Sequence, residues 1–110
     1  MSVIERERVE AEAPPITKRD LLHRAADLLE EFEWCQGDWG SKRTGKFCAH
    51  GALINATLDF GLGPNFGDGS VYEQANLTLR DLTGGILSWN DQADRTKAEV
   101  IAKLREAAEV

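Results

Sequence analysis

Hydrophobic residues recur at a helical spacing after Thr17 and predict an amphipathic helix over about residues 18–33. Thr17 and Asp20 stand at the spacing of a capping box at its start. Charged residues occupy the positions between the apolar ones, so this helix should lie at the surface with one face on the core. That face consists of Leu21, Leu22, Ala25, Leu28, Leu29 and Phe32.

The segment from Phe47 to Phe60 is apolar on nearly every side and has no polar face. A helix of this kind is normally enclosed by its neighbours, so we expect it at the centre of the fold. Gly51 lies inside this segment, where glycine costs about 1 kcal/mol relative to alanine. We therefore expect another stretch of backbone to pass close to Gly51.

Capping signals predict two more helices in the second half of the chain. Ser70–Glu73 is a capping box that starts one helix, and Gly84–Gly85 marks the end of that helix. Thr96–Glu99 is a further capping box, and it precedes a last amphipathic segment. These signals bring the number of predicted helices to four.

Glycine-containing connections separate the first three predicted helices. Residues 34–46 predict a structured loop or a short two-stranded excursion, and residues 61–70 predict a loop. Residues 86–91 predict an apolar connector that ends in a polar turn. The elements together predict an all-α fold, a compact four-helix domain with long glycine-containing loops.

A chain of 110 residues has room for one small domain. We place this domain at residues 17–110 and assign residues 1–16 to a charged N-terminal arm. Two interpretations of the arm stay open. It is either a solvated tail or an extended strand that docks on a partner through its sparse apolar residues.

The charge balance is acidic, with 13 Lys and Arg against 19 Asp and Glu and a net charge of −6. Such a surface repels phosphate backbones, so we do not expect nucleic acid as a partner. No apolar run reaches the roughly 18 residues of a membrane helix, and the N-terminus lacks the apolar run of a secretory signal. We therefore expect a cytoplasmic protein without membrane contact. Cys35 and Cys48 should stay reduced there, with a disulfide between them as the alternative.

Two patterns resemble ligand sites but are incomplete. Gly40–Phe47 approximates a phosphate-binding loop, yet Phe47 replaces the hydroxyl that holds magnesium and no parallel sheet is predicted. A basic turn is the favoured interpretation. The chain has two cysteines and two histidines, and their spacing does not match the paired ligands of zinc sites. We expect no metal and no other cofactor, but two buried thiols beside an exposed His50.

Cys48 is a weak candidate for a catalytic residue. It lies near the start of the expected 47–60 helix, where the helix dipole lowers the pKa of a thiol. A cysteine nucleophile also needs a positioned histidine base. His50 is only two residues away, and His23 lies on the first predicted helix, so the set is incomplete.

Trp39 is the best candidate for an exposed anchor to another protein. Trp34 and Trp89 also lie in connections, where we expect them to pack against the core. Trp39 instead lies near basic residues in a glycine-rich loop, and tryptophan and arginine are enriched at protein interfaces. We predict that partner binding involves Trp39, Lys42, Arg43 and Phe66.

Four short motifs follow one another along the chain: Trp34-Cys35-Gln36-Gly37, Cys48-Ala49-His50-Gly51-Ala52-Leu53, Trp89-Asn90-Asp91 and Arg95–Val100. Over residues 17–110 the chain resembles a small family of domains of unknown function from actinobacteria and their phages. The loop between the cysteine motifs is shorter than in many members, and His50 replaces a commonly apolar residue. The resemblance implies a bacterial cytoplasm or a phage-infected cell, and no established activity.

The motif residues have two interpretations. The turns at residues 34–37 and 89–91 should meet at one end of the 47–60 helix, where Gln36 and Asn90 either satisfy loop backbone groups or line a small pocket. We favour a structural role for Trp34, Cys35, Gln36, Gly51, Trp89, Asn90 and Asp91.

The leading functional hypothesis is a non-enzymatic protein–protein interaction module. Whether its gene is viral or chromosomal stays open; a phage-encoded form would act on a bacterial host protein. The alternative is a small cysteine-dependent enzyme, or a ligand- or metal-binding domain, that uses the region of Cys35, Cys48 and Asn90. Self-association into a homo-oligomer also stays open.

Overall fold

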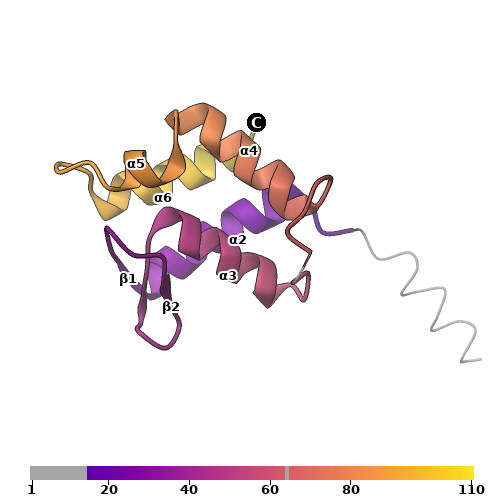
Figure 1. Cartoon of the computed structure of the whole chain (residues 1–110), viewed down its shortest axis with the longest axis horizontal. Helices are drawn as coiled ribbons and strands as arrows, with labels where there is room; N and C mark the ends of the chain where they lie inside the picture. Colours follow the sequence, from indigo (N-terminus) through magenta and orange to yellow (C-terminus); the bar gives the residue numbers. More distant parts are fainter. Residues whose placement is uncertain (1–14, 64) are drawn as a thin grey trace, which may run out of the picture.

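The computed structural model describes residues 15–63 and 65–110, which form five helices and one small sheet (Figure 1). The predicted compact and mostly helical fold is confirmed, whereas an all-α domain of four helices is wrong. A short helix, α5 (Ile86–Asn90), replaces the predicted apolar connector. Three short strands lie within residues 33–47, in and around the segment predicted as a structured loop or a short two-stranded excursion. The predicted N-terminal arm falls mostly on residues 1–14, which lie outside the described residues.

Helix α2 (Lys18–Glu31) is the element around which the longer helices gather. It packs against α3 (Ala49–Asp59), α4 (Val71–Thr83) and α6 (Lys97–Ala108). Its apolar residues occur in adjacent pairs, which widens its buried face enough to contact three neighbours. The buried residues of α2 are Leu21, Leu22, Ala25, Ala26, Leu28 and Leu29.

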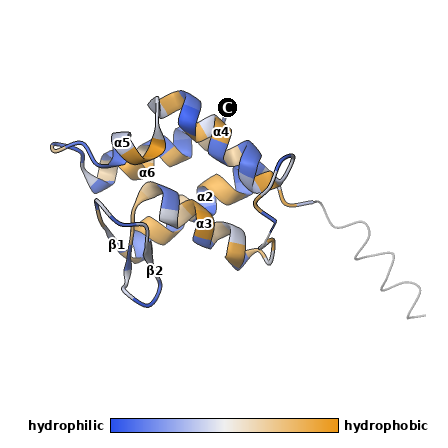
Figure 2. Ribbon diagram, in the orientation of Figure 1, coloured by the Kyte–Doolittle hydropathy of each residue, from blue (hydrophilic) through white to orange (hydrophobic). Residues whose placement is uncertain are grey.

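The prediction that the 47–60 segment forms the central, enclosed helix is wrong. Phe47 ends a strand, Cys48 is the N-cap residue, and α3 begins only at Ala49. The residues that α3 buries are mostly small, so one face of α3 packs closely on α2. Ile54 is only half-buried and Leu58 is exposed. Figure 2 shows hydrophilic as well as hydrophobic colours along α3, which packs on α2, α4, α5 and the small sheet but leaves its C-terminal turn exposed.

The helix ends follow the capping signals of the sequence. The side chains of Thr17, Ser70 and Thr96 each accept a hydrogen bond from a backbone N–H in the first turn of the following helix. Gly84 ends α4 in the left-handed conformation, with φ of 79°, which glycine adopts without strain. The predicted boundaries of α2, α4 and α6 therefore agree with the structure to within a few residues.

The three strands β1 (Glu33–Trp34), β2 (Gly40–Ser41) and β3 (Lys46–Phe47) form a sheet in the order β1-β3-β2. β3 pairs parallel with β1 and antiparallel with β2. Gly40–Phe47 is therefore a hairpin with a basic turn, which agrees with the favoured interpretation of this segment. Within the described residues, no helix is both long and apolar enough to span a bilayer.

Candidate functional site

The turns before β2 and after α5 meet at the N-terminal end of α3, where Asn90 connects them. The side-chain oxygen Oδ1 of Asn90 accepts hydrogen bonds from Trp34 Nε1 at 2.8 Å and from the Ala49 amide at 2.9 Å. Its Nδ2 donates to the Cys35 carbonyl at 3.1 Å and to Asp91 Oδ1 at 2.9 Å. Asn90 is fully buried, and all four hydrogen-bonding positions of its side chain are occupied.

Two neighbouring side chains extend this network, which we call the Asn90 joint. Gln36 Nε2 donates to the carbonyls of Asn90 at 3.0 Å and of Gln92 at 2.7 Å. Asp91 Oδ1 also accepts from the amide of Gly37 at 3.0 Å. Both predicted turns therefore meet, and their polar side chains satisfy backbone groups.

Trp89 lies beside the joint and is held by Arg95. The Arg95 guanidinium lies 3.9 Å from the centre of the Trp89 ring, and its Nε donates to the Trp89 carbonyl at 3.0 Å. Stacking of a guanidinium on an indole is a favourable cation–π arrangement. The sequence contains both residues in its motifs but gives no signal that they stack.

Cys48 lies at the start of α3, yet its environment disfavours the thiolate. The residue is only 1% exposed, and its Sγ accepts a hydrogen bond from the Gly51 amide at 3.3 Å. Burial raises the pKa of the Cys48 thiol more than these backbone contacts lower it. The expectation of a pKa lowered by the helix dipole is therefore wrong, because desolvation outweighs the N-terminal field.

The remaining groups of the proposed cysteine and zinc sites lie apart or have other partners. Cys35 is half-buried, its thiol donates to the Asp38 carbonyl at 3.3 Å, and burial raises its pKa. His23 pairs with Glu109, the two atoms lying 2.8 Å apart. His50 is half-buried rather than exposed, and it contacts both Trp39 and the Tyr72 hydroxyl. Within residues 15–63 and 65–110, no three potential ligands of a metal ion gather.

A second feature is a row of aromatic residues across α3 and α4, which we call the aromatic row. Trp39 lies edge-on to the His50 ring, with centroids 4.7 Å apart. His50 Nε2 lies 2.6 Å from the Tyr72 hydroxyl, and Phe66 lies edge-on to Tyr72 at 5.0 Å. The order along the surface is Trp39, His50, Tyr72 and Phe66. Edge-to-face contacts of this kind orient the rings as well as burying them.

Trp39 is 50% exposed although its backbone is firmly held. Its carbonyl accepts a hydrogen bond from the Cys48 amide at 3.1 Å and lies directly over Gly51. A Cβ atom at Gly51 would overlap this carbonyl, so the predicted close approach of backbone is confirmed. The loop thus presents an indole to solvent from a fixed position.

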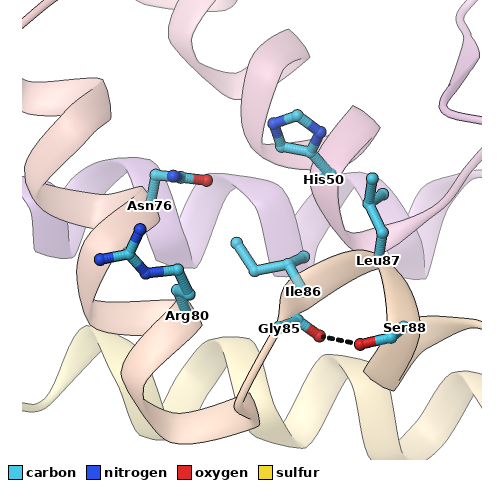
Figure 3. Close-up of a pocket in the computed structure, with 7 residues that line it drawn as sticks. All are labelled: His50, Asn76, Arg80, Gly85, Ile86, Leu87 and Ser88. Carbon is cyan, nitrogen blue, oxygen red and sulfur yellow. Dashed lines mark hydrogen bonds between the residues drawn. The ribbon is translucent and has the colours of Figure 1, made fainter.

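A pocket of about 460 Å³ opens beside His50, between α4 and α5 (Figure 3). Ile86 projects into its middle, with Asn76 and Arg80 of α4 on one side and Leu87 on the other. Leu87 is 44% exposed. The volume lies within the range of about 300–1,000 Å³ that ligand pockets usually have.

The predicted partner-binding residues divide between this surface and the hairpin turn. Trp39 and Phe66 belong to the aromatic row. Lys42 forms an ion pair with Asp59 at the far end of α3, and Arg43 is exposed in the turn. The pocket between α4 and α5 was not predicted from the sequence. The i, i+4 spacing of Asn76 and Arg80 is a weak signal of a shared helix face, and nothing indicated that α5 would complete the site.

Comparison of the chain with curated proteins and with solved structures gave no match. A family model does match residues 13–110, which include every residue of the Asn90 joint, the aromatic row and the pocket. The chain therefore belongs to the family of unknown function DUF6197.

Proposed function

We propose that this protein is a non-enzymatic interaction module that binds another protein through Trp39 and the adjoining pocket. The observation that carries the proposal is the half-exposed indole of Trp39, which lies on a fixed backbone and packs on His50 at the edge of an open, largely apolar pocket. Aromatic residues at the centre of an interface commonly supply a large share of the binding free energy. A side chain already held in place loses little entropy when a partner covers it.

The exposed apolar groups around the pocket support the same proposal. Leu87 is exposed and lines the pocket, and the exposed Trp39 packs on His50, which also lines it. Large apolar side chains that are exposed together usually mark an interaction site. The chemistry at the Asn90 joint offers less support for the alternative functions, because Cys48 is buried and Asn90 has no free hydrogen-bonding position.

The proposal includes a setting and a class of partner. The protein would act in the cytoplasm of a bacterium or a phage-infected cell, on a protein of the host. The resemblance that the four motifs carry supports this setting. The two free thiols also fit a reducing compartment. A second copy of the chain is the competing occupant of the same surface.

The proposal is tested by selecting peptides from a random displayed library on the immobilised full chain. The dissociation constants of selected peptides are then measured for the wild type and three variants. Trp39→Ala should weaken binding by about ten-fold or more, since a central indole contributes more than 1.4 kcal/mol. Phe60→Ala removes an exposed aromatic residue at the other end of α3 and should leave binding unchanged.

Cys48→Ser completes the test, because serine keeps a side chain suited to the N-cap position. This variant should fold and bind normally. Failure of any peptide to be enriched, equal binding by Trp39→Ala, or loss of binding in a folded Cys48→Ser variant would overturn the proposal. Sedimentation analysis of the same variants identifies a second copy as the occupant if a dimer forms and Trp39→Ala dissociates it.

A further inference from the structure

We infer that the pocket between α4 and α5 binds the C-terminal residue of a partner polypeptide, with its apolar side chain inside and its carboxylate on Arg80. This inference rests on the proposed function and specifies which part of the partner enters the pocket. It is carried by the lining of the pocket and by the charge of Arg80, which forms no ion pair within the described residues.

The inner part of the pocket fits an apolar side chain. Ile86 lies at its middle, Leu87 forms one wall, and Gly85 adds a stretch of backbone without a side chain. A volume of about 460 Å³ is ample for a leucine or phenylalanine side chain together with its backbone. Burial of such a side chain against Ile86 and Leu87 would supply the hydrophobic part of the binding free energy.

Arg80 gives the pocket a positive charge. Its guanidinium forms no ion pair with any carboxylate in the described part of the chain, even though the protein carries a net charge of −6. Burial lowers the pKa of His50, so that ring is neutral at neutral pH. Arg80 is therefore the one charged residue lining the pocket at this pH, and a planar guanidinium matches a carboxylate in a bidentate arrangement.

The presence of both features in one pocket favours a ligand that carries a carboxylate and an apolar group. Arg80 and Ile86 line the same open pocket, so a ligand that reaches both places its carboxylate and its apolar group near each other. In a polypeptide, a carboxylate and an apolar side chain share one Cα atom only at the C-terminal residue. Asn76 and Ser88 add polar groups that can bond the preceding peptide unit. The exposed Trp39 beyond His50 would contact residues further upstream.

The inference is tested with short peptides that end in leucine or phenylalanine, each prepared as the free acid and as the C-terminal amide. Binding to the full chain is followed by NMR, through the shifts of the Ile86 and Leu87 amides and the Arg80 side chain. The free acid should bind about ten-fold more tightly than the amide. A peptide that ends in alanine should bind more weakly than either, because it leaves the cavity unfilled.

Two matched variants locate the carboxylate. Arg80→Gln should abolish the preference for the free acid, whereas Arg19→Gln removes an exposed arginine from the first turn of α2 and should preserve it. Equal binding of acid and amide, or a preference that survives in Arg80→Gln, overturns the inference. Octanoate that causes the same shifts at equal affinity also overturns it, in favour of a small carboxylic acid.

The two proposals can fail separately. Selected peptides that still depend on Trp39 but show no preference for a free C-terminus would overturn only the inference about the pocket. A clear carboxylate preference that Trp39→Ala leaves intact would overturn the role of Trp39 and keep the pocket.

Discussion

Truncation of Asn90 should be among the most destabilising single changes in this protein. The side chain is fully buried and joins β1, α3 and α5 through four hydrogen bonds. Asn90→Ala removes all four bonds at once. The Trp34 indole N–H and the Ala49 amide N–H would then lose their acceptor in a region with little access to water.

The expected loss follows from these unsatisfied groups. Each buried donor left without a partner costs about 1–3 kcal/mol, and the lost bond to the Cys35 carbonyl adds about 1 kcal/mol. The sum is about 3–7 kcal/mol, a large share of the roughly 5–15 kcal/mol that typically stabilises a domain. The change should therefore be measurable as a marked shift of the unfolding midpoint.

Urea unfolding followed by far-UV circular dichroism measures this loss. Asn55→Ala is the matched control, because Asn55 is half-buried and its Nδ2 donates one hydrogen bond, to the Gly51 carbonyl within α3. The control should lose about 1 kcal/mol or less. If Asn90→Ala loses no more than Asn55→Ala, the Asn90 joint does not hold these elements together and the reasoning above is wrong.

Three further predictions concern single residues. Gly51→Ala should destabilise the protein by about 1–3 kcal/mol in urea unfolding, because the added Cβ overlaps the Trp39 carbonyl. Gly67→Ala should cause no such loss, because a Cβ at Gly67 meets no atom within 4 Å. Burial raises the pKa of both thiols, but Cys48 is only 1% exposed whereas Cys35 is half-buried, so native Cys48 should alkylate more slowly than Cys35 at neutral pH. Mass spectrometry should show equal rates only after unfolding, and equal rates in the native protein would contradict this prediction. Burial lowers the pKa of His50, so the unfolded state binds the proton first as the pH falls and stability should decrease below about pH 6.5. Between about pH 7.5 and 5.5 the free energy of unfolding should fall further in the wild type than in His50→Gln. Equal decreases in the two proteins would contradict the assignment.

The candidate sites differ in how far the sequence could predict them. The Asn90 joint was predictable in outline, because polar residues in two turns usually bond to backbone groups. The pocket was not predictable, since Arg80 and Ile86 become neighbours only when α4 and α5 pack together. The contact between His50 and Tyr72 likewise joins residues 22 positions apart.

Local chemistry in the sequence determined the ends of α2, α4 and α6, because caps and helical periodicity act over only a few residues. It also determined that Gly51 lies under another backbone segment. Only the tertiary structure decided that α2 rather than α3 lies at the centre, since that depends on which apolar faces meet. The same packing decided the state of Cys48: its place at a helix start follows from the sequence, but its raised pKa comes from the side chains that bury it.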